Sequence, residues 1–159
     1  MDLVSQRDVS RVVLIKIAPL ESGTLEGDFT APQEILRVEE VRGGDFINQP
    51  GEEVGWPYSE VVPEREGLVM ELAFGFLRAL CPWRIIGDDG NLVGSQLSPD
   101  AENLLSQLVK LSVIGISIKP SGLVSDLNLT LVNGWVLEFY SMSELETWEL
   151  SIMEGQVPE

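Results

Sequence analysis

The chain has 159 residues, of which 26 are Asp or Glu, 10 are Lys or Arg and none is histidine, so the formal net charge is −16. Without an imidazole, it lacks the Ser-His and Cys-His pairs of nucleophilic catalysis and any His ligand for a metal. A strongly negative field also repels phosphate backbones, so we expect no nucleic-acid binding.

Size and apolar content predict one folded domain over residues 1–159, because an apolar fraction of 44% is enough for a substantial core. The start of the chain lacks the layout of a secretory signal, and its longest apolar stretch, 12–20, contains Lys16 and is too short to span a bilayer. The single cysteine, Cys81, excludes an internal disulfide and is expected to fill a small space in the core. We therefore expect a cytoplasmic protein that makes no membrane contact.

Residues 9–18 are rich in β-branched side chains and predict a first strand that Pro19 ends. The next segment, 20–66, has a different composition, with four prolines and with 12 acidic residues against three arginines. We interpret it as an acidic, Pro/Gly-rich loop region and a plausible place for function. Within it, 32–36 is compatible with either a short helix or a strand.

Residues 67–152 are predicted to form a core of sheet and helix. Short strands are expected over 67–76, 77–80 and 83–87, and Asp88-Asp89-Gly90-Asn91 predicts a hairpin turn that leads to a strand after it. Ser98 as N-cap and Pro99 at the first position then indicate the start of a helix of about three turns, to Lys110, because leucines repeat at helical spacing.

Alternating apolar residues predict strands over 113–119, ended by Pro120, and over 126–132. Asn133-Gly134 predicts a two-residue turn with positive φ at both positions, followed by strands over 135–140 and 146–152, and the residues after 152 are expected to fray. The fold class is therefore α+β, with a mainly antiparallel, twisted sheet of about seven or eight strands and one principal helix packed on one face. Its exposed sheet edges allow a homodimer.

The four tryptophans divide into two groups. Trp83 and Trp148 are expected in the core because they lie between aliphatic residues on predicted strands, whereas Trp135 and Trp56 are candidates for partial exposure.

The acidic residues are unevenly distributed. From 21 to 71 there are 13 acids against three bases, and from 144 onward there are five acids and no base. Such segregation steers a basic partner, and an exposed aromatic can anchor an interface. The residues expected to bind the partner are Glu39, Glu40, Asp45, Glu52, Glu53 and Trp56.

The C-terminal half, roughly Leu68 to Ile152, contains a series of motifs: Trp83-Arg84-Ile85, Leu104 to Val113, Asp126 to Ser141 and Glu146 to Leu150. In these it resembles a family of small bacterial domains of unknown function, some of which are found among immunity-like proteins of polymorphic toxin systems. The resemblance implies an architecture and a role in toxin neutralisation. It carries no catalytic motif and does not cover the acidic segment before Gly67.

We therefore expect a non-enzymatic, acidic binding protein of the immunity type that neutralises a basic toxin domain and uses no catalytic residue, metal or cofactor. Two alternatives stay open. A carboxylate-based or divalent-metal-assisted hydrolase would need only acids, although the side chains of the adjacent pairs Glu39-Glu40 and Glu52-Glu53 are expected to diverge in a loop or strand. An assembly subunit would instead use an apolar interface.

Overall fold

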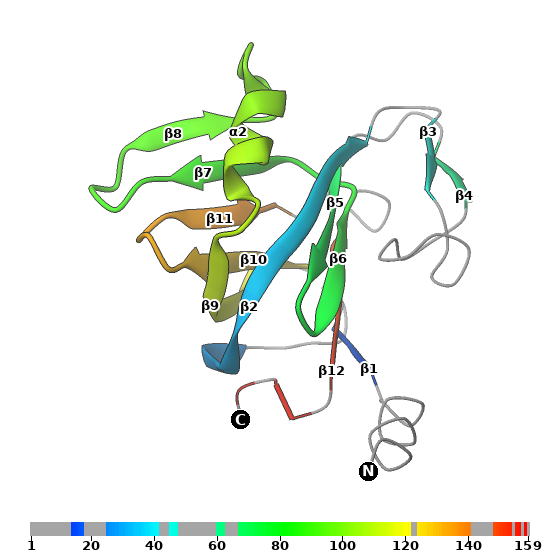
Figure 1. Ribbon diagram of the computed structural model, residues 1–159, viewed down its shortest axis with the longest axis vertical. Coiled ribbons are helices and arrows are strands. Elements are labelled where there is room, and N and C mark those ends of the chain that lie inside the picture. The colour runs from blue at the N-terminus through cyan, green and yellow to red at the C-terminus, as the bar shows by residue number, and fades with distance from the viewer. Residues whose placement is uncertain are drawn as a thin grey trace.

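The computed structural model describes residues 14–17, 25–41, 45–47, 60–62, 67–121, 124–140, 148–153, 155–156 and 158. Within these ranges the chain forms twelve strands and one helix (Figure 1). The elements are β1 (Leu14–Ile17), β2 (Leu25–Val41), β3 (Asp45–Ile47), β4 (Glu60–Val62), β5 (Gly67–Leu72), β6 (Gly75–Ala79), β7 (Trp83–Ile86), β8 (Leu92–Ser95), α2 (Ala101–Leu108), β9 (Ser112–Ser121), β10 (Val124–Leu131), β11 (Val136–Phe139) and β12 (Trp148–Met153).

Ten strands hydrogen-bond in the order β1-β12-β6-β5-β2-β9-β10-β11-β7-β8, and β3 and β4 form a separate pair. Every described pair of neighbours is antiparallel. The predicted α+β class with a mainly antiparallel sheet is therefore confirmed, although the sheet has more strands than the seven or eight expected. The helix α2 packs against β2 and β8 through the buried side chains of Ala101, Leu104, Leu105 and Leu108.

The long strand β2 belongs to two groups of strands. Its first part, 25–34, pairs with β9, and its second part, 35–41, pairs with β5. In Figure 1 it runs diagonally between the β9-β10-β11-β7-β8 group and the β5-β6-β12-β1 group, whose strands cross at a large angle. One continuous cluster of buried side chains fills the core and includes Met70 and Leu77 from one group and Leu129 and Leu137 from the other.

The prediction of a loop region over 20–66 is wrong for 25–31 and 37–41, and the choice left open at 32–36 is a strand, because 25–41 forms one 17-residue strand. Alternation explains the acidic composition, because Glu26, Asp28 and Glu34 are exposed while Phe29 and Ile35 are buried. Pro32 lies where the register with β9 shifts, between Asp28 and Gln33, so it interrupts no regular run of ladder hydrogen bonds. The acidic, proline-containing composition that predicts a loop therefore belongs to a strand with an acidic face and a bulge.

Gln33 is completely buried at the point where β2 changes partner. Its Oε1 accepts a hydrogen bond from the Phe74 N–H (3.1 Å), in the turn between β5 and β6. Its Nε2 donates to the Ala31 carbonyl (3.0 Å) and to Oε1 of Gln156 (3.3 Å). One amide side chain thus connects β2, the β5–β6 turn and the C-terminal segment.

The C-terminal segment packs against the same part of β2. The Thr30 N–H donates to the Gln156 carbonyl (3.1 Å), and the Thr30 hydroxyl donates to the Gly155 carbonyl (2.6 Å). The Ala31 N–H donates to Oε1 of Gln156 (3.2 Å). The expectation of a frayed end is therefore wrong for residues 153, 155 and 156. Met153 belongs to β12, and residues 155 and 156 supply acceptors to the stretch of β2 that β9 leaves unpaired.

Both predicted hairpins are confirmed, but the turn at Asn133-Gly134 is of another type. The Gly90 N–H donates to the Gly87 carbonyl (3.0 Å) and the Gly134 N–H donates to the Leu131 carbonyl (2.9 Å). In both turns only the glycine has a positive φ, +85° for Gly90 and +92° for Gly134. Each is a three-residue loop whose last residue has the left-handed backbone conformation. The turn at Gly134 is therefore not a two-residue turn with Asn133 also at positive φ.

The helix is shorter than predicted at both ends. Ser98 is not the N-cap, because its Oγ accepts a hydrogen bond from the Ser95 N–H (2.9 Å) at the end of β8. At the other end, the Leu111 N–H donates to the Leu108 carbonyl (3.0 Å) across Lys110, whose φ is +79°. This is a type II turn, in which the third position favours a left-handed residue, so the helix ends at Leu108.

The strand β9 continues through Pro120 instead of ending before it. Pro120 pairs with Ser125 of β10, whereas the described pairing with β2 ends at Ile118. No strand of the described residues lies beside Pro120 on the β2 side, so the missing N–H interrupts no ladder there.

The aromatic core agrees with the sequence. Trp83 and Trp148 are 2% and 0% exposed, Cys81 is buried, and Trp135 is half-buried against the core, as expected. Trp148 donates from Nε1 to the Ser125 carbonyl (2.9 Å), which pairs its polar atom inside the core.

We expect Gln33→Met to lower the free energy of unfolding by about 2 kcal/mol, because the Phe74 N–H loses a buried acceptor. Urea unfolding followed by tryptophan fluorescence measures the change. Gln107→Met, at an exposed position of α2, is the matched control and should change stability by less than about 0.5 kcal/mol. Equal midpoints for both variants would show that β2 does not depend on the Gln33 amide.

The two hairpin glycines provide a matched pair. Gly90→Ala should cost about 1 kcal/mol, because a Cβ there meets nothing within 4 Å and only the positive φ opposes it. Gly134→Ala should cost at least about 2 kcal/mol, because its Cβ would lie 2.7 Å from Cβ of Asp88 on the neighbouring hairpin. Thermal unfolding of the two variants compares them, and a larger loss for Gly90→Ala would contradict the packing of the two turns.

Candidate functional site

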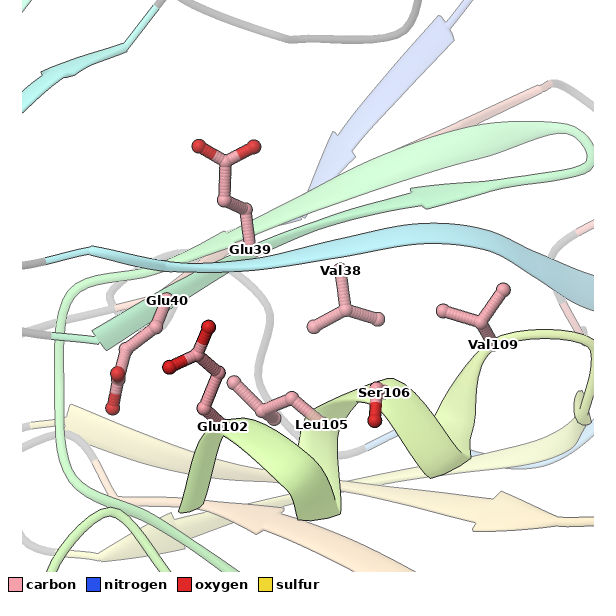
Figure 2. A pocket seen from close by; sticks show the side chains of 7 residues that line it. All are labelled: Val38, Glu39, Glu40, Glu102, Leu105, Ser106 and Val109. Carbon is pink, nitrogen blue, oxygen red and sulfur yellow. The ribbon is translucent and has the colours of Figure 1, made fainter. Parts of the chain in front are cut away.

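A groove of about 400 Å³ lies between the second part of β2 and the helix α2 (Figure 2). Its apolar side chains are Val38, Leu105 and Val109, and its polar ones are Glu39, Glu40, Glu102 and Ser106. Every charged residue in the described part of its lining is therefore acidic. A concave surface with an apolar floor and negative charge beside it suits an elongated ligand with an aliphatic part and a cationic end.

The alternation of β2 determines which of its acids faces the helix. Val38 and Glu40 are two residues apart and point toward α2, while Glu39 points to the other side of the strand (Figure 2). Glu39 forms an exposed ion pair with Arg37, with 3.8 Å between Nη2 and Oε2. Glu40 is therefore the acid of β2 that belongs to the interior of the groove.

The helix contributes one side to the groove and runs antiparallel to β2. Glu102, Leu105, Ser106 and Val109 repeat at the three- and four-residue spacing that places side chains on one helix face. The C-terminal end of the helix is tied to β2, since the Lys110 N–H donates to the Ile35 carbonyl (2.9 Å). The two acids lie together at the opposite end of the groove, near the start of α2 (Figure 2).

The structure brings together only part of the predicted partner-binding set. Glu39 and Glu40 both line the groove, although on opposite sides of β2. Asp45 is the first residue of β3, but the structure does not describe its side chain. Glu52, Glu53 and Trp56 lie outside the described residues. For these four residues the assignment to a binding surface stays a prediction.

Sequence reasoning missed Glu102. An acid in the first turn of a helix is expected from the helix dipole alone, so its presence pointed to helix stability and not to a site. The signal that identifies it is its position three residues before Leu105 and four before Ser106, on the face that meets β2. Only the pairing of β2 within the sheet shows what lies opposite that face.

A second polar cluster lies on β7 and β11, where Arg84 and Glu138 are directly opposite each other. Nε of Arg84 is 2.5 Å from Oε1 of Glu138, which also accepts a hydrogen bond from the Tyr140 hydroxyl. The guanidinium lies over the Tyr140 ring, 5.1 Å from its centroid. Burial, and then the bond to Glu138, raise the pKa of Tyr140, while that same carboxylate raises the pKa of Arg84. The three side chains satisfy one another, as expected for a structural cluster.

The residues that the structure describes lack two further features, a metal-binding cluster and a membrane-spanning helix. They contain no group of three or more Cys, Asp or Glu side chains placed to hold a metal ion. They also contain no helix that is long and apolar enough to cross a membrane.

Comparison with known proteins gives no assignment. No protein-family model matches the chain, and neither the curated proteins nor the solved structures contain a match. The resemblance of residues 68–152 to small bacterial immunity-type domains therefore stays a prediction.

The Tyr140 cluster predicts the direction of a pKa change. In a Tyr58→Phe background Tyr140 is the only tyrosine, and its ultraviolet titration should occur above the usual tyrosine pKa of 10.0. Glu138→Gln should lower the pKa of Tyr140 toward the usual value, because a neutral acceptor no longer opposes the phenolate. Since folding raises this pKa, the stabilisation is present below pH 10 and is lost as pH rises toward the folded value. An upward shift in the Glu138→Gln variant would contradict the cluster.

Proposed function

We propose that this chain is a non-enzymatic binding protein that takes a basic part of another protein into the groove between β2 and α2. Its concrete form is an immunity-type protein that neutralises a basic toxin domain in the cytoplasm. The observation that supports it is the placement of Glu40 and Glu102 at one end of a groove with an apolar floor, whose charged lining residues, among those that the structure describes, are all acids.

The chemistry of the groove favours a long cationic side chain. The methylene groups of Lys or Arg can lie on Val38, Leu105 and Val109, while the charged head reaches Glu40 and Glu102. A cation that reaches the Glu40 and Glu102 carboxylates would make charge-assisted hydrogen bonds with them.

The charge of the whole protein supports the same partner class. A net charge of −16 produces a field that attracts a basic protein over distances longer than direct contact. A toxin domain that binds phosphate groups has a basic surface, and an acidic protein that covers this surface blocks it without any catalytic step. Association should therefore be fast at low salt and slower as the ionic strength rises.

A labelled oligo-arginine peptide tests the groove directly. We expect the double variant Glu40→Gln/Glu102→Gln to weaken binding by about tenfold at low salt, because two carboxylates next to the ligand cation are lost. The matched control is Glu26→Gln/Asp28→Asn, which removes two exposed charges from the first part of the same strand. It should change the affinity by less than about twofold, since those charges act only through the screened field.

Fluorescence anisotropy at two salt concentrations measures both effects. Equal losses for the groove variant and the control variant would show that the peptide is held by net charge alone, and the groove would not be the binding site. Binding that does not weaken with salt would argue against a basic partner altogether.

A further inference from the structure

The strand wall of the groove is an edge of the sheet. Along 37–41, β2 pairs with β5 on one side only, because its pairing with β9 ends at Glu34. Ile35 is bonded on the second side to Leu111 and Lys110, with N···O distances of 2.8 and 2.9 Å. Beyond it, no strand of the described part of the chain lies between β2 and α2.

The alternation of hydrogen-bonded and non-hydrogen-bonded residue pairs between β2 and β5 shows in which direction the N–H and C=O of Val38 point. The Ala73 N–H donates to the Glu34 carbonyl (2.9 Å), so Ile35 and Leu72 face each other as a pair without mutual hydrogen bonds. The register shift at Leu36 adds one residue to β2, and the alternation then makes Val38 and Met70 another such pair. The N–H and C=O of Val38 are therefore directed away from β5, to the edge of β2 that no strand of the described residues occupies.

The hairpin of β5 and β6 leads to the same conclusion independently. Leu72 and Gly75 close a two-residue turn, which requires that the main chain of Leu72 bonds to β6. By alternation, Met70 also bonds to β6 and has no main-chain group for Val38. The bond between Ala73 and Glu34 and the turn between β5 and β6 thus indicate the same direction for the N–H and C=O of Val38.

We propose that an extended basic segment of the partner adds to β2 as a further strand, bonded through the N–H and C=O of Val38, with a Lys or Arg side chain lying on the apolar floor between β2 and α2. The inference rests on the function proposed above and names how its partner is held. Strand addition supplies main-chain hydrogen bonds, while alternate side chains enter the groove and give specificity.

Charge complementarity identifies the occupant as basic. The described lining of the groove has three acids and no base, so a second copy of this chain, at −16, is disfavoured there. The strand β8, at one end of the sheet, is less suitable for strand addition, because Ser98 already bonds both the N–H (2.9 Å) and the C=O (3.0 Å) of Ser95.

Three peptides test strand addition on the unmodified protein. The first is a short labelled peptide of alternating Arg and Val, the second is N-methylated at every Arg, and the third is N-methylated at every Val. All three have the same charge and side chains. In an added strand, alternate N–H groups point to β2 or to solvent, so one of the two methylated peptides should bind at least about tenfold more weakly and the other about as well as the parent.

Amide hydrogen exchange gives a second, residue-level measurement. Binding of the parent peptide should slow exchange of the Val38 N–H, while the Glu39 N–H, which the same alternation directs to β5, should change little. Loss of affinity for only one methylated peptide, together with protection of Val38, supports the added strand.

The failures of the two proposals are distinguishable. If both methylated peptides bind like the parent and Val38 exchange is unchanged, while Glu40→Gln/Glu102→Gln still weakens binding, strand addition is wrong and the acidic groove stands. If both methylated peptides lose affinity equally, strand addition is also wrong. If no peptide binds at about 1 mM, both proposals fail.

Discussion

The fold depends on the exchange of partners by β2, which pairs with β9 over its first part and with β5 over its second. At the exchange point the strand has main-chain groups that neither neighbour bonds, and buried groups of this kind are costly unless they are paired. Nε2 of Gln33 bonds the Ala31 carbonyl, and the carbonyl and Oε1 of Gln156 accept from the N–H groups of Thr30 and Ala31. These contacts join parts of the chain that lie far apart in the sequence, so the C-terminal segment helps to hold the two groups of strands together.

The groove is a consequence of the same exchange. Once β2 has left β9 at Glu34, its second half has an edge without a strand beside it, and α2 lies along that edge instead. Main-chain bonds between Ile35 and the end of the helix hold one end of α2 against β2. The other end carries Glu102 opposite Glu40, so the acids meet where the helix is not tied to the strand.

Net charge by itself does not separate a binding surface from a solvated one. The alternation of side chains along β2 helps to distinguish them, because it directs Glu40 toward α2 and Glu39 to the opposite side, where it pairs with Arg37. The exposed acids in the first part of β2 are not among the residues that line the groove with its apolar floor. Charge, an apolar floor and a strand edge coincide at the groove, and this coincidence supports the proposal that a partner binds there.

Local rules determined much of the chain from the sequence alone. The hairpins at Gly90 and Gly134, the leucine spacing of α2 and the burial of Trp83 and Trp148 follow from turn chemistry and hydrophobic periodicity, which act between near neighbours. The role of 25–41 was decided only by the tertiary structure, because an acidic, proline-containing stretch is stable as a strand only when β9, β5 and Gln156 bond to it. The placement of Glu40 and Glu102 in one groove was also decided by the tertiary structure. The two residues are 62 positions apart in the sequence, and only the packing of α2 on β2 brings them together.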